Sequence, residues 1–150
     1  MNSNPLGSNT PTQIGLVVPN IEEAVRAWSL LLGVPQPDIM ITDTVDLAHT
    51  EYKNQSTPAR AKLAFFPMGQ VTLELIEPIG EPSTWNDQLV EHGPSLHHIA
   101  FEIKGMSERI EELAGHGLTL VQHGDYTGGR YAYLDGQERL GAVIELLEND

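Results

Sequence analysis

Four polar residues stand inside short, mainly apolar segments of this 150-residue sequence. They are Gln13, Glu74, His98 and Glu145. Burying a carboxylate in such a segment is costly unless the carboxylate is paired or binds a cation. Two glutamates, one imidazole and one amide oxygen balance the charge of a divalent ion and leave coordination positions open. The four residues therefore predict a metal site, provided that the fold brings them together.

An internal repeat relates these residues in pairs. The segment QIGL, which begins at Gln13, matches HIAF, which begins at His98. The segment VTLELIE, which contains Glu74, matches AVIELLE, which contains Glu145. Each pair thus occupies equivalent positions in the two halves of the chain. A pseudo-twofold relation between the halves would bring all four side chains into one cavity.

Each half of the sequence also predicts the same order of elements, namely a strand, a helix and about three further strands. In the first half these are a strand at 13–18, a helix at 21–32 and strands at 62–66 and 70–77. In the second half these are a strand at 98–103, a helix at 106–114 and strands at 118–122, 130–134 and 142–147. Between them, residues 34–60 lack a clear pattern, and loops with one irregular strand are expected there. The predicted fold class is α+β, with two βαβββ modules in pseudo-twofold repeat that form a metal-binding cavity. Its predicted parts are a disordered tail at 1–11, a first module at 12–82, a linker helix at 83–95 and a second module at 96–150.

The alternation of side chains along a strand assigns a face to each residue. Ile14 points to the side that a helix should cover, and Gln13 points to the opposite side, toward the cavity. The same rule places His98 on the cavity side and His97 on the helix side. We therefore interpret His97 as a structural or supporting residue.

The charge balance limits the classes of partner. Lys and Arg number 8 against 21 Asp and Glu, which gives a net charge of −13 and a pI near 4.6. Nucleic acids and anionic membranes both require clustered positive charge, so neither is expected as a partner. The sequence has no cysteine, which excludes disulfides and thiolate metal sites. The first eleven residues lack the basic start and apolar stretch of a signal peptide, and a cytoplasmic protein is expected.

The segments around the four residues resemble the vicinal-oxygen-chelate superfamily, also called the glyoxalase/bleomycin resistance/dioxygenase superfamily. The resemblance runs from about residue 13 to residue 148. It is carried by QIGLVVPNIEEAVRAWSLLLG (13–33), LELIEPIGEPSTW (73–85), HGPSLHHIAFEI (92–103) and GAVIELLE (141–148). Within the superfamily these segments are most similar to methylmalonyl-CoA epimerases. The resemblance implies a divalent metal ion (Co, Ni, Zn or Mn) held by the same four residues.

Two of the four ligand positions depart from the epimerase pattern. Methylmalonyl-CoA epimerases usually have His at the position of Gln13 and often have Gln at the position of Glu74. The set Gln, Glu, His, Glu is similar instead to zinc-type glyoxalase I enzymes. The resemblance therefore implies a metal-dependent epimerase or isomerase that abstracts a proton next to a carbonyl, with a glyoxalase I-like lactoylglutathione lyase as the alternative.

Two further functions found in the superfamily fit these residues less well. A non-catalytic small-molecule binding protein of the superfamily usually lacks the metal residues, which this sequence keeps. Iron-dependent dioxygenases generally need two histidines and one carboxylate, and only one of the four residues is a histidine.

In the epimerase reading, Glu145 acts as both a metal ligand and the base, with Glu74 as its counterpart from the other half. The substrate would be an acyl-CoA or another α-substituted carbonyl acid. Such an anion needs local positive charge, and Arg60, Lys62 and Arg130 are the candidate substrate-binding residues. A homodimer is expected by analogy with relatives alone.

Overall fold

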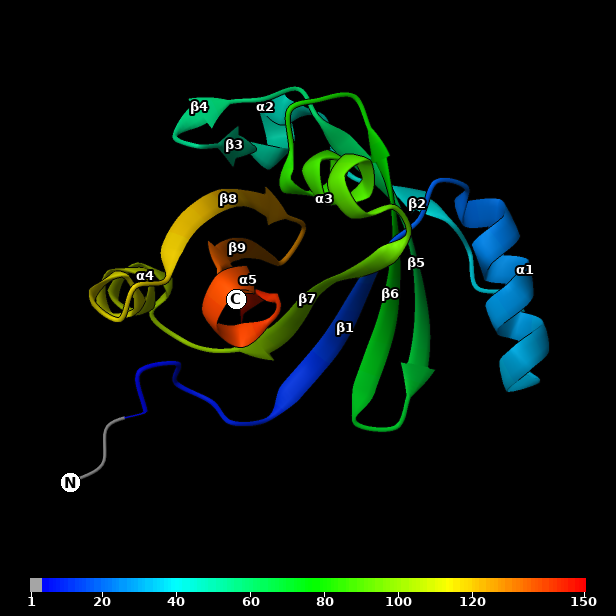
Figure 1. Cartoon of the computed structure of the whole chain (residues 1–150), viewed down its shortest axis with the longest axis horizontal. Helices are drawn as coiled ribbons and strands as arrows, with labels where there is room; N and C mark the ends of the chain where they lie inside the picture. Colours follow the sequence, from blue (N-terminus) through cyan, green and yellow to red (C-terminus); the bar gives the residue numbers. More distant parts are fainter. Residues whose placement is uncertain (1–3) are drawn as a thin grey trace.

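A single curled sheet of ten strands forms the body of the molecule in the computed structural model, which describes residues 4–150 (Figure 1). The strands are β1 (Pro11–Val17), β2 (Met40–Ile41), β3 (Glu51–Tyr52), β4 (Gln55–Ser56), β5 (Arg60–Met68), β6 (Val71–Ile79), β7 (Ser95–Glu102), β8 (Thr119–Tyr126), β9 (Gly129–Asp135) and β10 (Val143–Asn149). The helices are α1 (Ile21–Leu32), α2 (Val45–Ala48), α3 (Thr84–His92), α4 (Met106–Gly115) and α5 (Gln137–Leu140). None of the helices in the described residues is long and apolar enough to cross a membrane.

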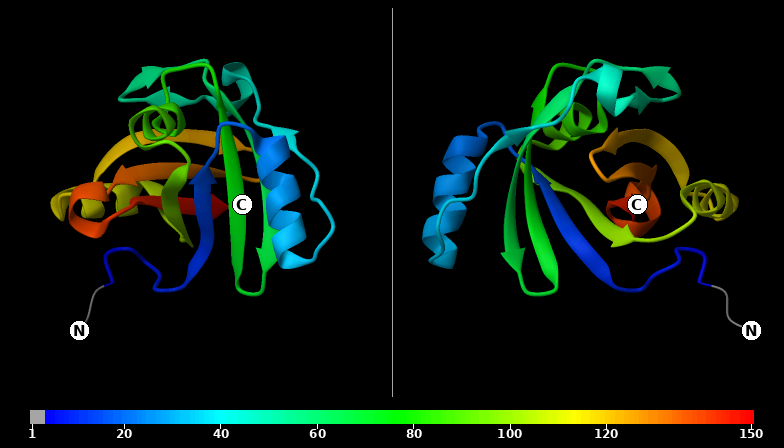
Figure 2. Two further views of the ribbon diagram at one scale, coloured as in Figure 1. Left: turned by 45° about the vertical axis from the view of Figure 1, so that its right-hand side comes forward. Right: turned by 180° about the vertical axis from the view of Figure 1, so that it is seen from behind.

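The strand order shows the predicted repeat directly. Across the sheet it reads β2-β5-β6-β1-β7-β10-β9-β8, followed by β3 and β4. Strand β1 runs parallel to β6, and β7 runs parallel to β10 in the same way. The two halves meet where β1 pairs antiparallel with β7. The α+β fold of two βαβββ modules is therefore confirmed, and the views in Figure 2 show the sheet curling around the space between the halves.

The long helices cover the outer faces of the two halves. Helix α1 begins after Asn20, whose side chain accepts a hydrogen bond from the backbone of Glu23, and ends at Gly33 in a left-handed conformation (φ 68°). Its residues Ile21 and Val25 pack on one side of β1, β5 and β6. Helix α4 covers the corresponding side of the second half, packing Leu113 against β9 and β10. The opposite face of each strand is left free for the cavity.

A glutamate at the end of a neighbouring strand binds the N-terminus of each long helix. Glu77 accepts a hydrogen bond from the backbone N–H of Ile21, at 2.9 Å. Glu148 accepts hydrogen bonds from the backbone N–H groups of Gly105 and Met106, at 2.8 and 3.2 Å. A carboxylate at this position satisfies free N–H groups and opposes the positive end of the helix dipole. The repeat thus extends to the interactions that hold each helix on the sheet.

Two regions differ from the sequence-based expectation. Residues 34–60 contain β2, α2 and a β3–β4 hairpin, where mostly loops were expected. The hairpin leaves the first half and pairs with β8 of the second, with Glu51 opposite His123. Residues 4–10 were expected to belong to a disordered tail, but Leu6 packs against the core under α4, and Arg109 donates a hydrogen bond to the backbone of Asn4. Pro11, the last residue of that predicted tail, begins β1, and residues 1–3 lie outside the described residues.

Candidate metal centre

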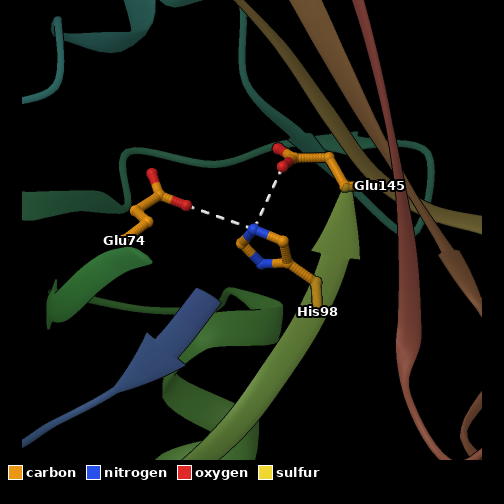
Figure 3. Close-up of side chains that lie close together, drawn as sticks. All are labelled: Glu74, His98 and Glu145. Carbon is orange, nitrogen blue, oxygen red and sulfur yellow. Dashed lines mark ion pairs between the residues drawn. The ribbon is translucent and has the colours of Figure 1, made fainter. Parts of the chain in front are cut away.

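Three of the four predicted ligands meet at one point between the halves of the sheet (Figure 3). The Nε2 atom of His98 lies 3.1 Å from Oε1 of Glu74 and 3.0 Å from Oε1 of Glu145. All three side chains are buried. Glu74 comes from β6, His98 from β7 and Glu145 from β10, so both halves contribute. The two carboxylates approach the same ring nitrogen from different sides.

The two carboxylate oxygens and the imidazole nitrogen that meet at this point have no hydrogen-bond partner in the described part of the chain. Among the described residues, only four buried side-chain polar atoms have no hydrogen-bond partner, and three of these are Oε1 of Glu74, Nε2 of His98 and Oε1 of Glu145. A single N–H could satisfy at most one of the two carboxylates. A divalent cation would satisfy all three atoms at once, and two carboxylates would balance its charge. The residues present therefore fit a metal ion.

The fourth predicted ligand, Gln13, lines the same space. A cavity of about 520 Å³ has Gln13, Glu74 and Glu145 in its wall. In the sheet, Gln13 lies two residues before Gly15, which pairs with His98. Gln13 thus lies on the cavity face of β1, as the alternation of side chains predicted.

Gly15 makes the room that the imidazole of His98 occupies. A Cβ atom at this position would lie only 2.1 Å from Cε1 of His98 and 2.5 Å from Nδ1. Glycine inside a strand often marks a close approach of this kind. The sequence shows a glycine at position 15, but it does not show that the ring of His98 requires it.

His97 supports the ligand histidine. Its Nδ1 lies 2.9 Å from Nδ1 of His98, and its Nε2 lies 3.1 Å from Oγ1 of Thr84. For Nε2 of His98 to bind a cation, Nδ1 of His98 must carry the proton and donate it to His97. His97 then carries its own proton on Nε2 and donates it to Thr84. Burial lowers the pKa of His97, and the nearby His98 lowers it further, which keeps this acceptor neutral.

His97 was expected on the side of the sheet that a helix covers, but it does not pack with the cores under α1 and α4 and contacts Thr84 at the start of α3 instead. The register of β7 against β1 shifts between His98 and Leu96, which pair with Gly15 and Leu16. A bulge of this kind breaks the alternation of side chains. Both histidines therefore pack against the ring of Tyr133, at centroid distances of 4.9 and 5.2 Å. The sequence shows two adjacent histidines, but it does not show the bulge in β7 that sets their orientations.

The electrostatics of the cluster favour a bound positive charge. Burial acts to lower the pKa of His98, but the carboxylates of Glu145 and Glu74 outweigh it and raise this pKa to about 10. Burial raises the pKa of Glu145, while His98 lowers it. Without a cation, the two carboxylates favour the protonated imidazole. Metal binding would release that proton, because a ligand nitrogen must be deprotonated.

None of the three predicted substrate-binding residues lines the cavity. Arg60 donates from Nε and Nη2 to the backbone oxygen of Thr42, at 2.9 and 2.7 Å. Lys62 pairs with Glu22 at 3.1 Å. The remaining residue, Arg130, pairs with Glu148 at 3.0 Å and with Asp150. The structure thus brings none of the three to the site.

The family model of the glyoxalase/bleomycin resistance protein/dioxygenase superfamily matches residues 12–133. The chain belongs to this superfamily. The superfamily resemblance seen in the sequence is therefore confirmed. The protein YqjC of Bacillus subtilis (strain 168) is 29% identical over 143 residues, which cover 93% of this chain and 92% of YqjC.

Two solved structures show how widely this superfamily fold is shared. Hypothetical protein BH1468 from Bacillus halodurans C-125 matches with a TM-score of 0.67 at 23% identity, covering 95% of this chain and 96% of that one. Methylmalonyl-CoA epimerase from Mycobacterium tuberculosis matches with a TM-score of 0.63 at 20% identity, covering 100% of this chain and 93% of that one. At these identities the two likenesses show the fold alone.

Proposed function

We propose that this protein is a metal-dependent isomerase or epimerase that moves a proton on the carbon next to a carbonyl group. One observation carries the proposal: a carboxylate from each half of the chain reaches the same buried imidazole nitrogen, within 3.1 Å. This arrangement supplies ligands for a cation and two potential bases in one place.

Gln13, Glu74, His98 and Glu145 would hold the cation. A divalent ion bound there supplies Lewis-acid stabilisation of the negative charge that develops on a carbonyl oxygen when its α-proton leaves. The protein supplies the base. Glu145 accepts the proton at a carboxylate oxygen.

The position of the second carboxylate suits a proton return from another direction. Glu74 and Glu145 approach Nε2 of His98 from two different directions (Figure 3). A proton removed on one side of a planar intermediate and returned on the other inverts the carbon, which is epimerisation. Return to the neighbouring carbon gives an isomerase. The fold shared with methylmalonyl-CoA epimerase supports this class of reaction.

The glyoxalase I-like alternative rests on the identity of the ligands. Gln13 and Glu74 match the ligand pattern of that branch rather than the usual pattern of the epimerases. Glutathione, however, carries two carboxylates, and no lysine or arginine lines the cavity in the described chain. This observation favours an isomerase over a lactoylglutathione lyase.

Replacing Glu145 by Gln tests the proposed base. The variant protein should keep most of its metal, because an amide oxygen can replace a carboxylate oxygen as a ligand. The rate of α-proton exchange should fall by at least about 100-fold, the usual contribution of a positioned base. Exchange is followed by NMR in deuterated water across acyl-CoAs, hemithioacetals and α-hydroxy ketones, and metal content by elemental analysis.

Glu111→Gln provides the matched control, because Glu111 is exposed on α4, away from the cavity. The control should exchange protons at the unmodified rate. If Glu145→Gln also exchanges at that rate with its metal bound, Glu145 is not the base.

A further inference from the structure

The walls of the cavity carry aromatic side chains. Five of the nine aromatic residues of the chain line it, namely Phe65, Trp85, Tyr126, Tyr131 and Tyr133. The rings of Trp85, Tyr131 and Tyr133 form one continuous group, with centroids 5.0 to 6.3 Å apart. Such a group presents flat apolar surfaces to a ligand.

Each metal-binding carboxylate lies beside one of these aromatic residues on the neighbouring strand. Phe65 pairs with Glu74 across β5 and β6, and Tyr133 pairs with Glu145 across β9 and β10. A ligand held at the metal centre therefore has an aromatic side chain on each flank. The cavity of about 520 Å³ lies within the size range of small-molecule sites.

The charged residues of the wall are all acidic. Apart from the metal-binding glutamates, Asp43, Glu102 and Asp125 line the cavity, and all three are exposed. Glu102 accepts a hydrogen bond from the side chain of Asn149, and Asp125 pairs with His49 at 2.8 Å. These carboxylates therefore form an anionic rim where the cavity meets solvent.

Among the described residues, Asp125 is the one rim carboxylate that pairs with a basic side chain, that of His49. All eight lysines and arginines lie in the described part of the chain, and none of them lines the cavity. The carboxylates of Glu74 and Glu145 already balance the charge of a divalent ion. A bound metal would therefore leave little positive charge to offset the acidic rim. A ligand that carries phosphates or free carboxylates would be repelled by the rim carboxylates, and no lysine or arginine in the wall would pair with it.

We propose that the substrate is an aromatic carbonyl compound that carries no anionic group. This inference rests on the proposed function for the reaction and adds the class of substrate. It places coenzyme A thioesters and glutathione adducts outside the substrates of this chain. The aromatic body packs between Phe65 and the Tyr131–Tyr133 pair, and the acidic rim admits a neutral or cationic body.

Binding to a matched series of probes tests the substrate class separately from the reaction. Phenacyl alcohol is neutral, aromatic and has adjacent oxygens beside exchangeable α-protons. Its para-carboxylate and para-trimethylammonium derivatives differ from it mainly in charge, and hydroxyacetone lacks the ring. The affinity of the metal-loaded protein for each probe, and for methylmalonyl-CoA, is measured by calorimetry at low salt.

Phenacyl alcohol and its cationic derivative should bind at least about tenfold more tightly than the para-carboxylate and methylmalonyl-CoA. Hydroxyacetone should bind more weakly than phenacyl alcohol, because it cannot pack against the rings. Raising the salt concentration should narrow the difference between the neutral and anionic probes, because salt screens the rim. Equal or tighter binding of either anionic probe overturns the inference.

Neutralising the rim provides a second test on the same chain. The double variant Asp43→Asn, Asp125→Asn should bind the para-carboxylate several-fold more tightly and leave the affinity for phenacyl alcohol unchanged. Glu111→Gln on α4 removes a charge far from the cavity and should alter neither affinity. The inference is also overturned if the ratio of the affinities for the para-carboxylate and for phenacyl alcohol is the same in the double variant as in the unmodified protein.

Proton exchange on the same probes separates the two proposals. If the neutral probes bind in the expected order but none exchanges its α-protons, the proposed reaction fails and the substrate class stands. If exchange occurs with a preference for the anionic probes, the substrate class fails and the reaction stands.

Discussion

Replacing Gly15 by Ala should remove the metal from an otherwise folded protein. The added Cβ would lie 2.1 Å from Cε1 of His98, which is 1.3 Å less than the 3.4 Å at which ordinary contact begins. It would also lie 2.5 and 2.6 Å from the two ring nitrogens. The contact spans the whole near side of the ring, so a small rotation cannot relieve it, and the imidazole must move by about 1.3 Å.

A displacement of this size is large for a metal ligand. Ligand distances are held within about 0.2 Å of their ordinary values, near 2.0 to 2.1 Å for nitrogen on zinc. Mutation of residues that only hydrogen-bond to the metal ligands already reduces metal affinity by about 10- to 100-fold. Loss of the only histidine ligand should therefore reduce the metal affinity of Gly15→Ala by more than about 100-fold. Overpacking should also reduce its free energy of unfolding by about 1–3 kcal/mol.

Competition with a chromophoric chelator measures the affinity, and circular dichroism establishes that the variant is folded at the assay temperature. Gly115→Ala is the matched control, because an added Cβ there meets no atom within 4 Å. The control should bind metal as the unmodified protein does. A folded Gly15→Ala protein whose affinity stays within about threefold of the control would refute the role given to His98.

Two further changes test groups that support the site and the fold. His97→Gln should weaken metal binding by about 10- to 100-fold, because the hydrogen bond that orients His98 is altered; an affinity equal to that of the unmodified protein contradicts the chain from His98 to Thr84. Glu148→Gln should lower the melting temperature at neutral pH, because it removes a stabilising carboxylate. The backbone N–H groups of Gly105 and Met106, together with Arg130, favour the ionised form of Glu148 and hold its pKa below 4.5. Since that pKa is lowered in the folded state, the stabilisation is present above pH 4.5 and is lost as the pH falls through the native value. The melting curves of the two proteins should therefore converge in acid, and a difference that stays constant between neutral and acidic pH would count against this account.

Local signals explain the elements that could be predicted from the sequence. The helix at Ile21–Leu32 has the predicted limits, because Asn20 and Gly33 are good capping residues and the apolar residues between them follow the helical period. Glu74 and Glu145 could be paired because a duplicated sequence pattern keeps equivalent residues on equivalent strands. These signals depend only on neighbours along the chain or on the repeat.

The features that were missed depend on distant contacts. Strand β3 has only two residues and forms because β8, far along the chain, pairs with it. The orientation of His97 depends on a bulge against β1. The sequence shows that Arg60 and Lys62 are close to each other, but not that a backbone oxygen and Glu22 already engage them. Positive charge near a strand is therefore a poor guide to a substrate site.

Because the proposed metal ligands come from both halves of the chain, metal binding would require both modules to be folded together. The first module alone contains Gln13 and Glu74, and a growing chain lacks the last ligand until Glu145 in the final strand has been synthesised. Because a bound ligand stabilises only the state that binds it, the metal would favour the fully assembled sheet over any form in which the halves have separated. Cells that express a truncated chain would thus have a protein that neither holds its ion nor gains the ion's contribution to stability.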